Sequence, residues 1–291
     1  MGEYKIKDLE QLTGVKAHTL RIWEKRYGII APQRTTTAIR TYSDEDLRRL
    51  LCISILNKSG YKISRIADMS IDKINDLVDD LNMGSDATLY FEKLLYALVE
   101  FDENLFQSTI NQLIIQFGVP RTFTEFFIPF LNRIGVMWVT GSINPAQEHF
   151  ITNLIRQKLI AEINLLEVPK MSNGVVILFL PESEWHELGL LFYHYILRNK
   201  GLYTVYLGQS LPYDSLIETI QKFDPIALVT SVLSHYEDKA LINYFQQIKE
   251  KFPDLPLFAG GYQIDQQIDK LSSLVIRIQS IETLNQIEIQ A

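Results

Sequence analysis

The chain has 291 residues, of which 47% are hydrophobic and 22% charged, the composition of a globular protein of about two or three domains. Cys52 is the only cysteine, which excludes an intramolecular disulfide framework and a thiolate-rich metal site. No apolar run approaches the roughly 20 residues of a membrane span. Residues 1–11 lack the apolar core of a signal peptide, so we expect a cytoplasmic protein with no membrane partner.

The formal net charge of −7 is distributed unevenly. Residues 1–65 carry 13 Lys and Arg against 7 Asp and Glu, a balance of +6. The rest of the chain carries 15 basic against 28 acidic residues, a balance of −13. Such asymmetry is typical of a protein that binds nucleic acid with its basic end.

The first segment runs to about residue 80 and begins with the pattern of a helix-turn-helix. A short helix ends at Gly14, and a second helix begins near Lys16. Their apolar stripes consist of Ile6, Leu9 and Leu12 in the first helix, and of Leu20, Trp23 and Tyr27 in the second. After a stretch that contains Pro32, Ser43 precedes three acidic residues and predicts the start of a third helix, which ends near Gly60.

The second segment, residues 85–166, is predicted to be helical throughout. Apolar spacing favours helices near 89–98, 106–114 and 120–138, the last closed by Gly141. Asn144 followed by Pro145 predicts the start of a fourth helix that extends to about Leu166. Four amphipathic helices with short connections indicate a four-helix bundle, and the polar stretch 82–86 is the expected linker before it.

The third segment, residues 167–291, alternates between strands and helices. Strands are expected at 175–180, 203–207, 226–231, 257–259 and, more weakly, 274–278, and helices at 187–200, 213–223, 237–251 and the C-terminal end. Strands without polar alternation, separated by helices, indicate a parallel sheet buried on both faces. In such sheets, ligands bind beyond the carboxyl ends of the strands.

The residues TLRIWEKRYGIIAPQR and RTYSDEDL resemble the MerR family of winged-helix regulators, and this resemblance covers most of the first segment. It implies that the second helix enters the major groove of double-stranded DNA while the wing contacts the backbone. His18, Thr19 and Arg21 are then expected to face the groove, and Arg40 and Tyr42 to lie on the wing near the phosphates. Trp23 and Tyr27 are expected in the core. Members of the family usually act as dimers on palindromes.

The loop after the first strand of the third segment contains Glu184, His186 and Gly189. A histidine at the mouth of a parallel sheet can ligate a metal through its neutral imidazole, and a nearby carboxylate can fix its tautomer. Gly189 allows the following helix to approach a bulky ligand closely. Taken alone, this string is weak evidence for a metal ligand and favours a structural or incidental histidine.

Three motifs at successive strand ends resemble cobalamin-binding domains. The loop matches the Asp-x-His-x-x-Gly signature in a Glu variant, Ser231 and Leu233 match its Ser-x-Leu motif, and Gly260 and Gly261 match its Gly-Gly motif. The resemblance implies a Rossmann-like, flavodoxin-like domain that binds cobalamin in the base-off form. His186 would be the lower cobalt ligand, oriented by Glu184. The displaced nucleotide tail would lie in a slot lined by Gly189, Ser231, Leu233, Gly260 and Gly261.

The bundle carries one further motif. Trp138, nine intervening residues and then Glu148-His149 resemble the Trp-x9-Glu-His motif of the light-sensing CarH-type subgroup of MerR regulators. The resemblance implies that Trp138, Glu148 and His149 contact the adenosyl side of adenosylcobalamin. In that subgroup a histidine follows the motif tryptophan and can capture cobalt after photolysis, whereas Val139 stands here. A stable bis-histidine photoproduct then requires another histidine, for which His149 is the candidate.

The predicted fold class is therefore multidomain α and α/β: a winged helix-turn-helix over 1–80, a helical bundle over 85–166 and a Rossmann-like sheet domain over 167–291. The leading hypothesis is a transcriptional repressor, not an enzyme, whose oligomeric state (dimer or tetramer) is set by adenosylcobalamin and light. Two alternatives stay open: a cobalamin-sensing or partner-controlled regulator that does not respond to light, and a corrinoid methyltransferase module. The basic first segment argues against the methyltransferase module.

Overall fold

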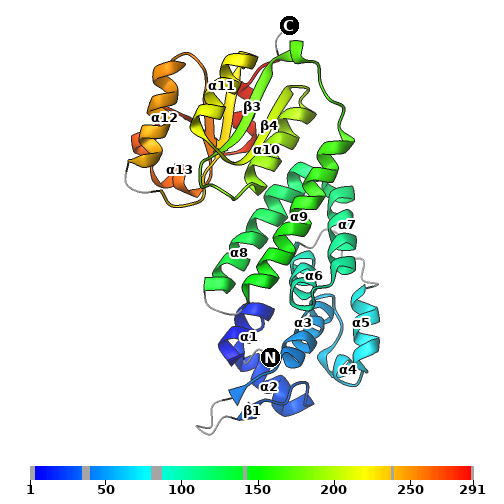
Figure 1. Cartoon of the computed structure of the whole chain (residues 1–291). Coiled ribbons are helices and arrows are strands. Elements are labelled where there is room, and N and C mark those ends of the chain that lie inside the picture. Colours follow the sequence, from blue (N-terminus) through cyan, green and yellow to red (C-terminus); the bar gives the residue numbers. More distant parts are fainter. Residues whose placement is uncertain (1–3, 35–39, 80–86, 140–142, 237–238, 290–291) are drawn as a thin grey trace. The chain divides into compact units, whose positions relative to one another are not determined.

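The computed structural model describes residues 4–34, 40–79, 87–139, 143–236 and 239–289 (Figure 1). The chain forms two compact units, Met1–Leu154 and Ile155–Ala291, here called the N-terminal and the C-terminal unit. Their boundary lies inside helix α9 (Pro145–Leu165). The domain limits expected at 80, 85 and 166 stay predictions, and the expected linker 82–86 lies outside the described residues. Within the described part of the chain, no helix combines the length and apolar character needed to cross a membrane.

The N-terminal unit begins with the predicted helix-turn-helix. Its elements are α1 (Ile6–Thr13), α2 (Ala17–Tyr27), the antiparallel strands β1 (Gln33–Arg34) and β2 (Arg40–Thr41), and helices α3 (Asp44–Lys58), α4 (Ile63–Ala67) and α5 (Ile71–Asp79). Gly14 ends α1 with a φ of 68°, a conformation that glycine adopts without strain. The Ser43 hydroxyl accepts a hydrogen bond from the Asp46 amide (3.2 Å), so the predicted start of α3 is confirmed.

The bundle consists of α6 (Ala87–Glu100), α7 (Glu103–Arg121), the π-helix η1 (Thr122–Phe127), α8 (Ile128–Val139) and α9. Gly118 lies inside α7 with non-helical angles (φ 74°, ψ 164°), two residues before Pro120. This break separates the second predicted helix from the third, which begins close to the expected position. At α9, the Gln147 amide donates to Asn144 Oδ1 (3.0 Å), and the predicted cap is therefore confirmed. Gly141 lies outside the described residues.

A buried polar cluster joins the helix-turn-helix to the bundle within this unit. The Glu92 carboxylate of α6 is 3% exposed, pairs with Lys58 of α3 and accepts from the Ser54 hydroxyl at 3.2 Å. Arg133 of α8 donates to the carbonyls of Gln11 and Leu12 in the last turn of α1. Cations are favourable at a helix C-terminus, so these contacts stabilise the packing of the DNA-binding helices on the bundle.

The C-terminal unit contains a five-stranded parallel sheet in the order β4-β3-β5-β6-β7. The strands are β3 (Val175–Pro181), β4 (Tyr203–Leu211), β5 (Ala227–Ser231), β6 (Leu257–Gly260) and β7 (Ile276–Arg277). One face packs on α10 (Leu188–Asn199) and the 3-10 helix η3 (Ile281–Gln286), and the other on α11 (Tyr213–Phe223), α12 (Ala240–Lys251), α13 (Tyr262–Gln266) and α14 (Ile268–Leu271). The predicted fold class is confirmed, with a flavodoxin-like strand order.

Several details differ from the sequence prediction. β4 continues to Leu211, four residues beyond its expected end, and a register shift against β3 accompanies the extension. The expected C-terminal helix is the short 3-10 helix η3, and the weak strand at 274–278 is reduced to β7. Short elements at a chain end form few local hydrogen bonds, so their conformation depends on the sheet on which they pack.

Candidate cobalamin site and DNA-binding surface

The candidate site lies at the topological switch point of the sheet, the place where the strand order reverses. β3 is flanked by β4 on one side and by β5 on the other, so the connections after β3 and β5 leave toward opposite faces. In open α/β sheets, ligands bind at such a switch point. The loop after β3 carries Glu184 and His186, and the loop after β5 carries Leu233 and Ser234.

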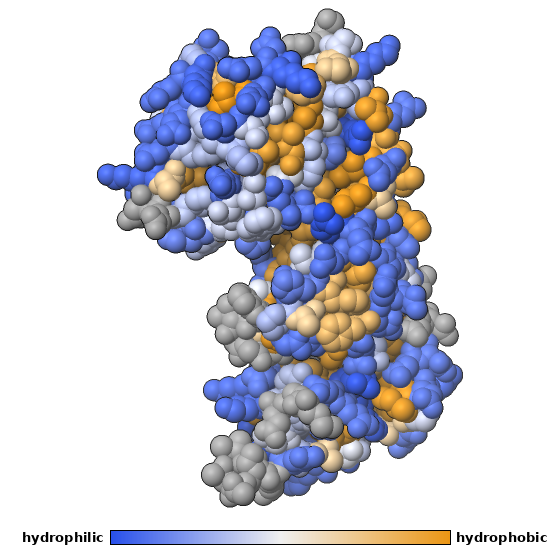
Figure 2. Space-filling view, viewed as in Figure 1, coloured by the Kyte–Doolittle hydropathy of each residue, from blue (hydrophilic) through white to orange (hydrophobic). Residues whose placement is uncertain are grey.

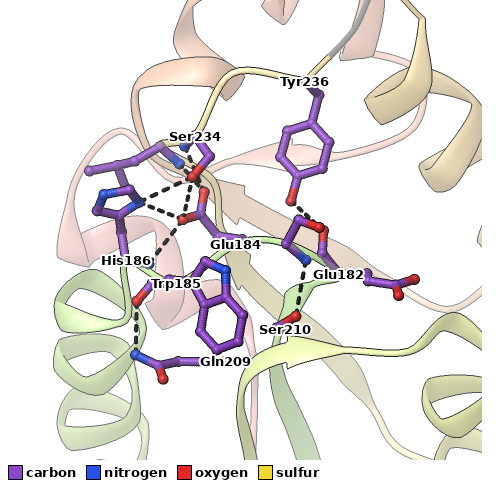
Figure 3. Close-up of polar contacts among 10 residues, drawn as sticks. Glu182, Glu184, Trp185, His186, Gln209, Ser210, Ser234 and Tyr236 are labelled. Carbon is purple, nitrogen blue, oxygen red and sulfur yellow. Dashed lines mark hydrogen bonds and ion pairs between the residues drawn. The ribbon is translucent and has the colours of Figure 1, made fainter.

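The Glu184 carboxylate links these two loops and is fully buried (Figure 3). Its Oε1 accepts from the amide and Nδ1 of His186 (2.9 and 2.7 Å) and from the Ser234 hydroxyl (3.0 Å). Its Oε2 accepts from the amides of Leu233 and Ser234, both at 2.7 Å. The two strand ends are therefore held together by hydrogen bonds to a single carboxylate.

The same hydrogen bonds determine the charge of Glu184. Burial by itself raises the pKa of a carboxyl group, but the hydrogen bonds from His186, Ser234 and Leu233 outweigh burial and lower the pKa of Glu184 to about 2. Glu184 is thus a carboxylate throughout the neutral pH range. A buried anion with this many donors is well satisfied.

The His186 ring is anchored through Nδ1. Its side chain is 60% exposed, and Nδ1 lies 2.7 Å from Glu184 Oε1 and 3.2 Å from the Ser234 hydroxyl. A carboxylate acceptor favours the tautomer with the proton on Nδ1, and in that tautomer the lone pair resides on Nε2. This arrangement is suited to metal ligation through Nε2, with the carboxylate fixing the orientation of the ring.

Small residues surround the second half of the candidate site. A Cβ atom added to Gly189, at the start of α10, would lie 3.0 Å from the Ser231 hydroxyl oxygen. A Cβ atom added to Gly261, which has a φ of 99°, would lie 2.5 Å from the Val232 carbonyl oxygen. Gly260 is buried at the end of β6, whereas Leu233 is 42% exposed. The glycines therefore permit close approaches that any side chain would prevent.

Residues that the sequence reasoning missed hold the histidine loop against β4. The Gln209 side chain donates to the Trp185 carbonyl (2.8 Å), and the Ser183 amide donates to the Ser210 hydroxyl (3.1 Å) (Figure 3). On the other side of the loop, the Tyr236 hydroxyl donates to the carbonyl of Glu182 (2.9 Å). No local pattern could have identified these partners, because they lie more than twenty residues away in the chain.

Glu187, directly after the candidate ligand, is a second missed residue. It is 6% exposed, its Oε2 accepts from the Tyr206 hydroxyl (2.9 Å) and its Oε1 pairs with Arg156. Tyr206 belongs to β4, and Arg156 to the part of α9 that lies in the C-terminal unit. Glu187 therefore fixes the start of α10 to two other elements of this unit.

The three residues expected on the adenosyl side lie in the N-terminal unit. Glu148 ends the first turn of α9, where its Oε1 accepts from the Thr152 hydroxyl (2.8 Å), and His149 follows with a side chain that is 72% exposed. Trp138 is in the last turn of α8, and its side chain lies outside the described part of the structure. Their part in cofactor binding stays a prediction.

The residues expected to contact DNA are distributed over α2 and β2. On α2, His18 and Arg21 are exposed and Thr19 is partly buried. Arg40 is exposed on β2 and lies 3.4 Å from Glu24.

Tyr42 does not fit its expected place among the phosphate contacts. It is only 1% exposed, because it pairs with Tyr4 in an isolated β-bridge and directs its hydroxyl to Glu24 Oε2 (3.4 Å). The aromatic ring is therefore part of the core of the helix-turn-helix. Burial raises the pKa of Tyr42 to about 12, with the charge of Glu24 adding to the effect.

Two families and several known proteins are similar to this chain. A family described as MerR HTH family regulatory protein matches residues 4–71, and a family described as B12 binding domain matches residues 90–161, which correspond to the bundle. The HTH-type transcriptional repressor CarH of Myxococcus xanthus is 26% identical, and the alignment covers 89% of this chain and 88% of that protein. The repressor CarA of the same organism is 22% identical over 93% of this chain and 90% of that protein.

One solved structure shares the fold. The monomethylamine corrinoid protein of Methanosarcina barkeri has a TM-score of 0.57 and 18% identity, and the match covers 69% of this chain and 97% of that chain. At this level of identity the likeness concerns the fold alone.

A MerR-type helix-turn-helix joined to a B12-binding domain defines a transcriptional regulator that binds DNA and cobalamin. The chain is, more particularly, a regulator similar to CarH and CarA along most of its length.

Proposed function

We propose that this protein is a repressor whose oligomeric state, and thereby its DNA affinity, is set by adenosylcobalamin and light. The observation that carries the proposal is the Glu184–His186 pair, buried carboxylate and exposed imidazole, at the switch point of the sheet. It occurs in a chain that resembles two repressors, CarH and CarA, over most of its length.

The residues around the switch point fit a base-off corrinoid. His186 would provide the lower cobalt ligand through Nε2, with Glu184 holding Nδ1, and the nucleotide tail would lie along Gly189, Ser231, Leu233, Gly260 and Gly261. Bound adenosylcobalamin would supply a cobalt–carbon bond that visible light breaks. Trp138, Glu148 and His149 are proposed as contacts of the adenosyl group on the strength of the motif resemblance alone.

Control through assembly follows from mass action. A ligand that binds one oligomeric state more tightly than another shifts the population by its differential affinity. Each basic segment carries only a modest positive balance, so useful DNA affinity requires several DNA-binding segments in one assembly. We propose that the dark, cofactor-bound form is a tetramer built from dimers.

Exposed apolar side chains on the bundle support the assembly proposal. On α8, Ile128 and Val136 are 41% and 60% exposed, and on α7 Ile115 is 85% exposed. Ile128 and Val136 are eight residues apart and therefore share one face of α8. Figure 2 shows apolar patches among the hydrophilic side chains of the visible surface. Apolar groups in such positions are typical of protein–protein contacts.

The second candidate function is a cobalamin-sensing regulator without a light response. The observation that favours it is Val139, which follows Trp138 where the light-sensing subgroup has a histidine. Operator binding in the dark, titrated with methylcobalamin and adenosylcobalamin, separates the two candidates. A sensor of cobalamin alone responds to both forms, whereas the light-responsive protein requires the adenosyl form.

The test of the proposal is gel filtration of the full chain, prepared in the dark with adenosylcobalamin, before and after green light. We expect a coloured protein whose elution volume increases after illumination, and no colour in His186→Ala. His235→Ala, which removes another exposed histidine near the sheet edge, is the matched control and should stay coloured. A colourless wild type would refute cofactor binding, and an unchanged elution volume would refute the light response.

A further inference from the structure

The slot in which the nucleotide tail would lie contains a side chain of the protein itself, Tyr193. Tyr193 is on α10, four residues after Gly189, so both residues lie on the same face of that helix. This face covers β3, β5 and β6, and the Tyr193 ring packs on the core beneath α10. The ring therefore lies beside the glycines that line the slot.

The Tyr193 ring fills the space beside Gly260. A Cβ atom added to Gly260 would lie 2.2 Å from the Tyr193 hydroxyl oxygen and 3.2 Å from the ring carbon that bears it. The same Cβ atom would lie 3.4 Å from Cβ of Ile278. The phenol thus rests directly on the backbone of Gly260, and Ser231 beside it is only 1% exposed. The small size of Gly260 accommodates the tyrosine rather than a ligand.

The tyrosine is held by packing alone. No described residue forms a hydrogen bond with its hydroxyl, and burial together with the charge of Asp265 raises the pKa of Tyr193. Tyr193 is only partly buried, so moving the phenol out to water increases the hydration of its hydroxyl group at the expense of packing. Packing favours the closed position, and hydration favours the open one.

We propose that Tyr193 is a gate residue of the tail slot: a nucleotide tail enters only when the phenol leaves, so Tyr193 sets the affinity for corrinoids that carry such a tail. The inference rests on the proposed cobalamin site. It also predicts selectivity, because a corrinoid without the nucleotide tail needs only His186 and leaves the gate closed. Binding of a tail-less corrinoid is accordingly independent of Tyr193.

The test compares two probes on the full chain in the dark: hydroxocobalamin, which has the tail, and hydroxocobinamide, which lacks it. Binding is measured by equilibrium dialysis and by the absorbance change on histidine ligation. In Tyr193→Ala we expect hydroxocobalamin to bind at least about tenfold more tightly, the factor expected when an aromatic side chain no longer has to leave its buried position, and cobinamide to change less than about twofold.

Two further variants make the result decisive. Tyr193→Leu retains an apolar side chain and should give the same direction of change if the alanine variant folds poorly. Tyr195→Ala removes a tyrosine of the same helix near Glu162 and should affect neither probe. An unchanged or weakened affinity of Tyr193→Ala for hydroxocobalamin would overturn the gate while leaving the cobalamin site intact. Failure of both probes to bind any variant, wild type included, would instead overturn the proposed cofactor site and the gate with it.

Discussion

Replacing Glu184 with glutamine isolates the role of the buried carboxylate. Every group that contacts the Glu184 oxygens is a donor: two groups of His186, two of Ser234 and the amide of Leu233. Glutamine has nearly the same shape, but its amide nitrogen is a donor and faces donors. One side of the carboxylate site is therefore left without an acceptor.

The size of the expected loss in stability follows from the lowered pKa of Glu184. The pKa of Glu184 falls from 4.5 to about 2, which corresponds to about 3.5 kcal/mol at about 1.4 kcal/mol per unit. Solvent screening does not reduce this free energy, because the Glu184 side chain is fully buried. Buried donors left without partners cost about 1–3 kcal/mol each, which gives the same order. We therefore expect Glu184→Gln to destabilise the C-terminal unit by about 3 kcal/mol.

The pH dependence has a definite sign. A carboxyl group with a lowered pKa in the folded state contributes stability above its unfolded pKa, near 4.5, and loses it as the pH falls through about 2. The wild type should lose this stability between those values, whereas Glu184→Gln should lack that part of the pH dependence.

Urea unfolding of the full chain, followed by circular dichroism, measures the effect. With a slope of about 1–3 kcal/mol per molar urea, the transition of the C-terminal unit should move by about 1–3 M. Corrinoid affinity should fall about 10- to 100-fold, as expected when the partner of a metal-ligating histidine is lost. Glu182→Gln, an exposed neighbour with the same change in charge, is the matched control. Equal midpoints for the two variants would refute the reasoning.

Three further changes address other parts of the molecule. Arg21→Ala on α2 should weaken operator binding by about 1–3 kcal/mol if the side chain reads a base, or lower the salt slope by about 1 if it contacts a phosphate; binding at several salt concentrations decides which. Lys58→Met should destabilise the N-terminal unit by about 2 kcal/mol or more, since Glu92 is left as an unpaired buried carboxylate, and adding Glu92→Met should restore much of the loss in thermal unfolding. Gly261→Ala should cost more than about 2 kcal/mol in urea unfolding, because a positive φ and a backbone contact of 2.5 Å act together.

Matched controls exist for two of these changes. Lys73→Ala removes an exposed cation on α5 and should change operator affinity less than Arg21→Ala does. Gly28→Ala also has a positive φ, 60°, but meets no atom within 4 Å, so backbone strain of about 1 kcal/mol is the whole expected cost. A loss in Gly261→Ala no larger than that in Gly28→Ala would contradict the assigned close contact.

Much of the fold, and the location of the candidate site, can be recognised from local sequence patterns. The polar caps at Ser43 and Asn144 and the uninterrupted apolar strands depend on a residue and its near neighbours, so they can be recognised in the sequence. The same holds for the order of Glu184, His186 and the glycines at strand ends, because the carboxyl ends of parallel strands lie on one edge of the sheet. Fold class and the location of the candidate site therefore follow from sequence alone.

Tertiary structure decided what surrounds those residues. Glu184 accepts hydrogen bonds from the amides of Leu233 and Ser234 and from the Ser234 hydroxyl. These donors lie about fifty residues from Glu184 in the chain, and a local sequence pattern cannot predict a backbone donor at that separation. The sequence placed Tyr42 on the surface, but packing against Tyr4 buries it. The close approach of the Tyr193 phenol to Gly260 likewise depends on the distance between α10 and β6. Distances between segments are set by the packing of the whole core, which a linear pattern does not contain.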